Sequence, residues 1–147
     1  MGALRVVYVR HRSLSSVLIR AGAWWGPSSH CGLIDGDDVI ESLARRGGVV
    51  VTPLANVLAH ASAHAVVDIQ CPRPDLGIEW ARSTVGAPYD WTGVIAIPLR
   101  ERDWQEPDAW YCSEHVEAAA ARAGAVRWRS GMHGIHPCVS YYAAGSA

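Results

Sequence analysis

Residues 108–124, DAWYCSEHVEAAAARAG, are the segment around which we expect the rest of the chain to be organised. Asp108 is a candidate N-cap, the alanine-rich sequence favours a helix, and Gly124 is typical of the residue that follows a helix C-terminus. Cys112 is expected in the first turn of this helix. The positive end of the helix dipole and the free N–H groups there favour the thiolate, which is the nucleophilic form of cysteine. The sequence therefore makes Cys112 a candidate nucleophile.

A histidine far upstream is the candidate base for this cysteine. His30 begins a predicted strand over residues 30–34 (HCGLI), and the Asp-Gly pair in residues 35–37 predicts a hairpin to a second strand over residues 38–42 (DVIES). A residue on the returning strand can approach the opening residue of the first strand, so Glu41 is a candidate to orient the imidazole. We therefore expect His30 and Cys112 to meet across the fold as base and nucleophile.

The remaining pattern predicts a single α+β domain over residues 1–147, with a largely antiparallel central sheet and packed helices. Further strands are expected at residues 4–9, 49–52 and 65–70, and further helices at residues 13–20, 53–63 and 75–85. A chain of this length is long enough to build its own hydrophobic core.

The composition excludes several function classes. Half of the 147 residues are hydrophobic and the formal net charge is −1, which argues against binding nucleic acid by phosphate neutralisation. No stretch reads as a signal peptide or a transmembrane segment. We therefore expect a cytoplasmic protein by default, with release by another route or association with a virion left open. The four cysteines match no small disulfide scaffold, so reduced thiols are expected.

Four short motifs in the same order resemble those of a known family. They are HCGLI at residues 30–34, VIES at residues 39–42, GAPYDW at residues 86–91 and WYCSE at residues 110–114. Together they resemble the permuted NlpC-like cysteine hydrolases of the YiiX/YaeF type, which are circularly permuted papain-like domains related to the lecithin:retinol acyltransferase group. The order of histidine before cysteine is the mark of the permutation. The similarity extends over residues 13–144.

The resemblance implies a function and a set of roles. Cys112 looks like the nucleophile, His30 like the general base and acid, and Glu41 like the orienting third member, with Ser42 as the alternative for that position. Tyr89 looks like a pocket residue that helps an oxyanion hole beside the backbone N–H of Cys112. The activity implied is cleavage of an amide or ester bond through an acyl-enzyme, without a cofactor. The implied substrates are peptides or acyl-containing molecules, such as cell-wall peptides or lipid-linked acyl groups.

Two other readings of the same residues remain open. Cys31 and His115 stand where the family has aliphatic residues, and with His30 and Cys112 they form a set of zinc-like chemistry, although no CxxC pair accompanies them. The domain could instead be a non-catalytic binding or structural part of a larger phage or secretion assembly.

The sequence also offers a candidate for the rim of the substrate site. Trp24 and Trp25 lie in a Gly/Pro-containing loop just before His30, so they are candidates to contact substrate.

Overall fold

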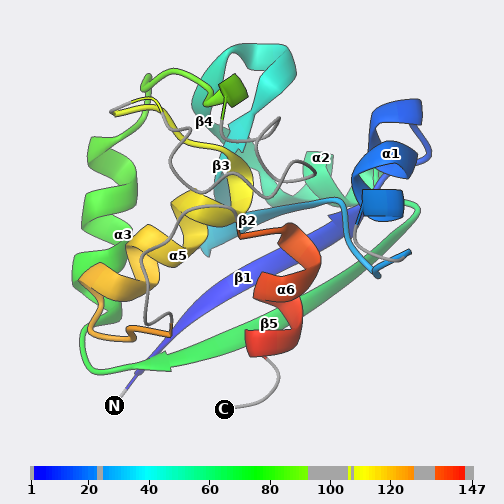
Figure 1. Cartoon of the computed structure of the whole chain (residues 1–147). Helices are drawn as coiled ribbons and strands as arrows, with labels where there is room; N and C mark the ends of the chain where they lie inside the picture. Colours follow the sequence, from blue (N-terminus) through cyan, green and yellow to red (C-terminus); the bar gives the residue numbers. More distant parts are fainter. Residues whose placement is uncertain (1, 23–24, 93–105, 107, 128–134, 145–147) are drawn as a thin grey trace.

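Five strands form one antiparallel sheet in the described part of the chain. The computed structural model describes residues 2–22, 25–92, 106, 108–127 and 135–144. The strands follow the order β4-β3-β2-β1-β5, and every neighbouring pair is antiparallel (Figure 1). Their bounds are Gly2–Arg10 (β1), His30–Asp35 (β2), Asp38–Leu43 (β3), Gly48–Pro53 (β4) and Ala63–Cys71 (β5). The α+β class and the antiparallel sheet predicted from the sequence are confirmed.

The β2–β3 hairpin fixes which side chains share a face of the sheet. Gly36 has a φ of 63°, the left-handed conformation that the Asp-Gly turn predicts. Leu33 pairs with Ile40, and both belong to the same buried cluster on one face. His30 pairs with Val9, which belongs to the buried cluster on the opposite face. Because successive side chains of a strand point to opposite faces, Cys31 and His30 begin on different sides of the sheet.

The two faces of the sheet carry different helices. Helices α3 (Pro74–Ser83), α5 (Cys112–Arg122) and α6 (Pro137–Ala144) lie over one face, with α5 between the other two (Figure 1). On the opposite face, α2 (Leu54–Ala59) contributes Val57 to the second buried cluster. Helix α1 (Leu14–Gly22) follows β1, and the three-residue 3₁₀ helix η1 (Ala44–Arg46) joins β3 to β4. The site described below draws residues from both faces.

Helix α5 is a central, buried helix. Every residue from Cys112 to Ala120 is buried. Helix α3 approaches α5 closely because Gly77 has no side chain: an added Cβ would lie 2.7 Å from the Ala119 carbonyl oxygen and 3.2 Å from Cβ of Ala123. The small residues at this contact therefore permit tight packing of the two helices.

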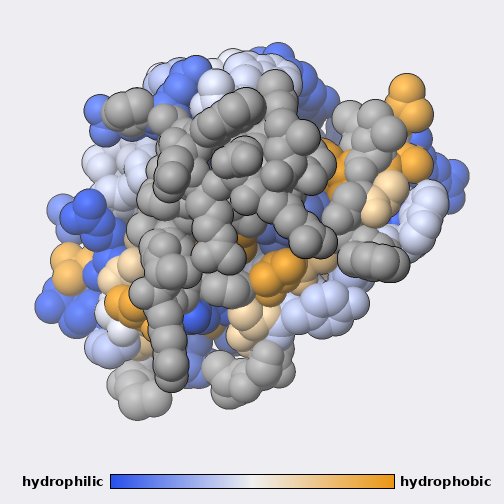
Figure 2. Space-filling model, in the orientation of Figure 1, coloured by the Kyte–Doolittle hydropathy of each residue, from blue (hydrophilic) through white to orange (hydrophobic). Residues whose placement is uncertain are grey.

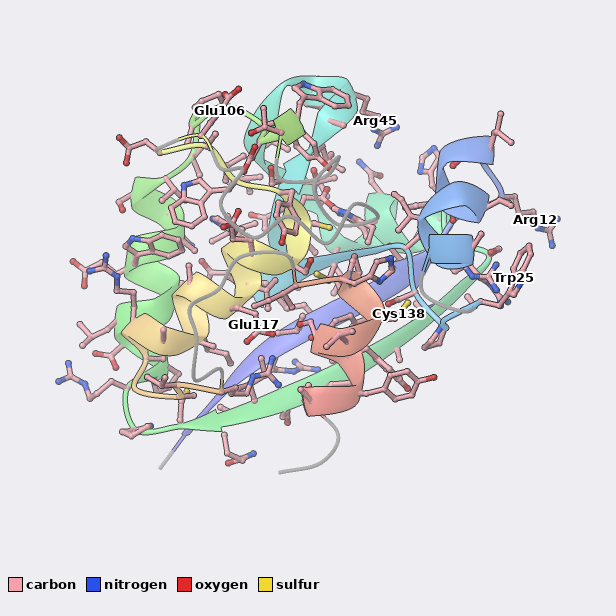
Figure 3. The ribbon with its side chains drawn as sticks, viewed as in Figure 1. Arg12, Trp25, Arg45, Glu106, Glu117 and Cys138 are labelled. Carbon is pink, nitrogen blue, oxygen red and sulfur yellow. The ribbon has the colours of Figure 1, made fainter. Side chains whose placement is uncertain are left out.

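A buried polar network anchors α5 against α6 and β1. Glu117 forms an ion pair with Arg127 and accepts a hydrogen bond of 2.6 Å from Ser140. The Ser140 hydroxyl in turn lies 2.8 Å from the hydroxyl of Tyr8. Figure 3 shows Glu117 projecting from α5 toward α6. A buried carboxylate needs such partners, since burial of an unpaired charge is costly.

Two predicted helix boundaries are wrong. Helix α5 begins at Cys112 and not at Asp108: Tyr111 is its N-cap, and Asp108 has a φ of 62°, outside the helical region. Gly124 lies just beyond the helix with a φ of 87°, as a C-terminal stop predicts. The predicted helix over residues 53–63 is only Leu54–Ala59, because Ala63 pairs with Arg10 as the first residue of β5.

The described surface facing the viewer in Figure 2 is largely hydrophilic, with apolar residues in small separate groups. None of the described helices has the length and apolar character that crossing a bilayer requires.

Candidate active site

The structure brings His30 and Glu41 into direct contact. His30 Nε2 donates a hydrogen bond of 2.6 Å to Glu41 Oε2, and the two residues are 9% and 2% exposed. Burial opposes the Glu41 charge, but the bond to His30 and a further hydrogen bond from Thr52 hold the pKa of this carboxyl below its usual range. The hairpin explains the contact, because continuing its register places Glu41 opposite Gly32, two residues along from His30 on the same face.

The contact between His30 and Glu41 requires a glycine at position 32. A Cβ at Gly32 would lie 2.5 Å from Cγ1 of Val39 and 2.9 Å from Cβ of Glu41. Both distances are shorter than packed carbon atoms tolerate. The missing side chain therefore leaves the space in which Glu41 reaches His30.

Cys112 is the first residue of α5, so its thiol lies at the positive end of the helix. The pKa of Cys112 is held well below its usual value, first by a hydrogen bond from the Cys31 thiol and then, against the opposing effect of burial, by His30. Burial also opposes charge on His30, but hydrogen bonds to Cys112 and Glu41 raise its pKa to about 10. The environment therefore favours a thiolate on Cys112 and an imidazolium on His30.

His30 joins side chains that belong to opposite faces of the sheet. Glu41 lies on the α2 side, where it lines a pocket with Val57. Cys112 belongs to the buried cluster on the α5 side. As the first residue of β2, His30 lies at the end of its strand, where its ring interacts with both. Because Nε2 is engaged by Glu41, Nδ1 is the ring nitrogen left for the thiol.

From the sequence, Cys31 was interpreted only as a departure from the family pattern and as a possible metal ligand. In the structure its thiol has no solvent exposure and lies near Cys112, whose pKa it lowers. Burial, together with Cys112, raises the pKa of Cys31 well above its usual value, so this thiol stays protonated and remains a donor. The signal was present in the predicted hairpin, whose register turns Cys31 toward the face that α5 covers.

Replacing Cys31 by alanine is expected to slow alkylation of Cys112 by iodoacetamide at pH 6 by about 3- to 10-fold. One lost hydrogen bond to the thiolate is worth about 0.5–1.5 kcal/mol, and 1.4 kcal/mol corresponds to tenfold. The rate is measured by mass spectrometry of the Cys112 peptide. Cys31→Ser retains an O–H donor and should recover most of the rate. Equal rates in the native protein and in Cys31→Ala would show that this thiol does not activate Cys112.

Ser42 does not contact the imidazole. Its hydroxyl donates a hydrogen bond of 2.6 Å to the carbonyl of Trp110, two residues before Cys112. Of the two candidates for the third position, Glu41 is therefore the one that contacts His30. Ser42 instead ties β3 to the segment that leads into α5.

Tyr89 lies beside the segment that leads into Cys112. It forms a bridge with Trp110, and its backbone N–H donates a hydrogen bond of 2.8 Å to Gly47. Burial and the charge of Cys112 raise the pKa of Tyr89 above its usual value, so the phenol is neutral and close enough to feel that charge. This position is compatible with the pocket role that the resemblance implies.

The next residue of the GAPYDW motif meets the first turn of α5. Asp90 and Glu114 are both fully buried. Burial and the charge of Asp90 raise the pKa of Glu114 to about 8, so one of the two carboxyls is largely protonated at neutral pH. The third and fourth motifs of the sequence are thus in contact in the fold, a link that their separation along the chain did not reveal.

The tryptophan loop is only partly described. Trp24 lies outside the described residues. Trp25 is 64% exposed, and the Arg20 guanidinium lies 5.8 Å from the centre of its ring. Figure 3 shows Trp25 at the outer edge of the molecule below α1. No described contact joins Trp25 to the site, and a role at the substrate rim stays a prediction.

His115, one of the four residues of the zinc-like set, is engaged by residues outside that set. His115 Nε2 lies 2.8 Å from the Thr84 hydroxyl, and its ring packs against Trp80 and Trp110. Burial lowers the pKa of His115 to about 4, so this histidine is a neutral core residue. Within the described ranges, no three His, Cys, Asp or Glu side chains are grouped so that they could hold a metal ion. The described residues therefore give the zinc hypothesis no support.

The geometry defines a buried Cys–His–Glu arrangement between the start of a helix and the edge of an antiparallel hairpin. Comparison with solved structures finds a similar fold in the metalloprotein YiiX from Escherichia coli O157:H7. The TM-score is 0.62 at 23% sequence identity, over 83% of this chain and 66% of that chain. This chain thus spans just under two thirds of that relative. No family model matches the sequence, and no curated protein matches it significantly.

Proposed function

We propose that this protein is a thiol hydrolase of permuted papain-like architecture that cleaves an amide or ester bond through Cys112, His30 and Glu41. The observation that carries the proposal is the 2.6 Å bond between His30 and Glu41, in a buried site where His30 also lowers the pKa of Cys112. The structural similarity to YiiX supports the α+β fold that we propose for this hydrolase. The order of histidine before cysteine along the chain supports the permutation.

The chemistry follows from the charges of the site. The Cys112 thiolate attacks the carbonyl carbon of the substrate, and the carbonyl oxygen becomes an oxyanion. The backbone N–H of Cys112, which has no partner within its own helix at the first helical position, would donate to that oxygen, with Tyr89 beside it. His30 gives its proton to the leaving group, and Glu41 keeps the ring oriented. His30 then removes a proton from water, which releases the acyl group from Cys112 and restores the thiolate.

The substrate class comes from the family resemblance. Cell-wall peptides and lipid-linked acyl groups both present the carbonyl that this chemistry needs. The YiiX structure is described as that of a metalloprotein. The described residues of the present chain do not fit a metal ion, so no step is assigned to one.

The proposal is tested by trapping the acyl-enzyme. The protein is incubated with p-nitrophenyl acetate, p-nitrophenyl octanoate and a chromogenic amide of a cell-wall-type peptide, and the adduct is located by mass spectrometry. We expect acylation of Cys112 with release of the chromophore, and loss of both by at least 100-fold in Cys112→Ser, because the alcohol is a far weaker nucleophile at neutral pH.

Cys71→Ser is the matched control, since Cys71 is also a buried free thiol but lies at the end of β5. It should acylate Cys112 at the native rate. Release of chromophore that survives in Cys112→Ser would contradict the assignment of the nucleophile. A native protein that forms no adduct with any substrate class would favour a non-catalytic binding or structural domain.

A further inference from the structure

We propose that a pocket on the α2 face of the sheet, behind the His30–Glu41 pair, binds a phosphate group. The pocket has a volume of about 310 Å³, and Glu41 and Val57 are its buried lining residues. Its polar lining includes Arg45, Arg46, His11, His60, Asn56 and Thr52. Cys112 is not among the lining residues, so the pocket is distinct from the nucleophile side of the site.

The net charge of this pocket is positive. Arg45 and Arg46 lie on η1, between β3 and β4, and neither forms an ion pair with another described residue. Figure 3 shows Arg45 at the outer end of the β3–β4 region. Glu41 is the acidic residue of the lining, and its charge is matched by the His30 imidazolium to which it is bonded. Arg45 also acts on this carboxylate, since its charge helps to lower the pKa of Glu41. Two guanidinium groups and one imidazolium therefore face a single carboxylate in and beside the described part of the pocket.

The two histidines of the pocket are held in fixed orientations. His11 Nδ1 lies 3.0 Å from the carbonyl oxygen of His60, and His60 Nδ1 lies 2.8 Å from the carbonyl oxygen of Asn56. Carbonyl oxygens only accept, so both Nδ1 atoms must carry the proton. Nε2 is then the ring nitrogen of each histidine that is left for a ligand.

This donor set fits a phosphate group better than a carboxylate. Two guanidinium groups and an amide offer more N–H donors than the two oxygens of one carboxylate can use. A phosphate monoester presents three terminal oxygens and nearly two negative charges at neutral pH, and arginine forms bidentate hydrogen bonds with it. The volume lies at the lower end of the range for small-molecule sites, which suits free phosphate or a small phosphate monoester.

The experiment is calorimetric titration of the full chain at pH 7 and low ionic strength, where surface charges are least screened. The probes are inorganic phosphate, glycerol 3-phosphate and, as a dianion without phosphorus, succinate. We expect saturable 1:1 binding of phosphate, at least tenfold weaker binding of succinate, and at least tenfold weaker phosphate binding in Arg45→Gln/Arg46→Gln. Tighter binding of glycerol 3-phosphate would assign the site to a monoester, and equal binding would assign it to free phosphate.

Arg5→Gln/Arg73→Gln is the matched control, because it removes two exposed arginine charges that are paired elsewhere, with Asp68 and Asp75. It should bind phosphate as the native protein does. Cys112→Ser should also bind phosphate with the native affinity. The test of the phosphate site is therefore independent of the test of the hydrolase proposal. Absence of saturable phosphate binding, unchanged binding in Arg45→Gln/Arg46→Gln, or succinate binding as tight as phosphate would overturn the inference.

Discussion

Replacing His30 by alanine is expected to slow the alkylation of Cys112 by iodoacetamide at pH 6 by at least about tenfold. The variant loses the charge that stabilises the thiolate, so the pKa of Cys112 should rise toward the ordinary thiol value of about 8.5 or above it. The fall in thiolate population exceeds the partial gain in intrinsic nucleophilicity that accompanies a higher pKa. Removal of a ring can only open access to the sulfur, so slower labelling cannot result from a blocked site.

The pH profile distinguishes this charge effect from a general loss of structure. The pKa of Cys112 is lowered, so the native thiolate persists as the pH falls below 8.5, and the pKa of His30 is raised, so the imidazolium persists until the pH approaches about 10. The native labelling rate should therefore be nearly flat from weakly acidic pH to about pH 8, whereas in His30→Ala it should rise steeply through pH 8.5.

Labelling of the other three cysteines, followed in the same samples, reports on unfolding, since Cys31, Cys71 and Cys138 are 0%, 1% and 2% exposed whereas Cys112 is 7% exposed. These three cysteines should label slowly in both proteins. A His30→Ala profile that coincides with the native one would remove the chemical basis of the catalytic proposal.

Local sequence rules account for the part of the site that lies on the hairpin. The Asp-Gly turn sets the register of β2 and β3, and the register places Glu41 near His30. The helix that carries Cys112 was also predictable from its alanines and from Gly124. Its start was not, because the acidic residue that resembles an N-cap, Asp108, adopts a positive φ and the helix begins four residues later.

The contacts between the hairpin and α5 could not be derived in this way. Whether Cys31 is an inert core thiol or a donor to Cys112 depends on how closely the helix approaches the sheet, and that distance is set by side chains from many elements. The hydrogen bond from Ser42 to Trp110 and the proximity of Asp90 to Glu114 likewise join segments far apart along the chain. Periodicity assigns a residue to a face, but only the packed structure shows which residue it meets there.

The site is built across the end of the sheet and not on one of its faces. The helix face supplies Cys112 and its donor Cys31, while the opposite face supplies Glu41. His30 links the two because it is the first residue of its strand. Such an arrangement makes the site sensitive to small shifts of the β2–β3 hairpin, since a displacement of Glu41 changes the orientation of the ring that acts on Cys112.

Gly32→Ala should produce such a shift, and we expect it to lower both the stability of the fold and the reactivity of Cys112. The new methyl group would lie 2.5 Å from Val39 Cγ1 and 2.9 Å from Glu41 Cβ, so one or both strands must move. Overpacking of this kind costs about 1–3 kcal/mol, which in a domain of this size lowers the melting temperature by roughly 2–12 °C. With Glu41 displaced from His30, the imidazolium loses its partner, and alkylation of Cys112 at pH 6 should slow by about tenfold, the effect of 1.4 kcal/mol.

Gly77→Ala separates the two effects, because it overpacks a different contact. Its Cβ would lie 2.7 Å from the Ala119 carbonyl oxygen, between α3 and α5 and two turns from Cys112. We expect this variant to lose a comparable amount of stability in thermal unfolding while Cys112 labels at nearly the native rate. If both glycine variants slow labelling equally, reactivity follows overall stability. If Gly32→Ala alone slows it, the space beside Glu41 is a specific requirement of the site, because the reactivity of Cys112 then depends on a contact made on the opposite face of the sheet.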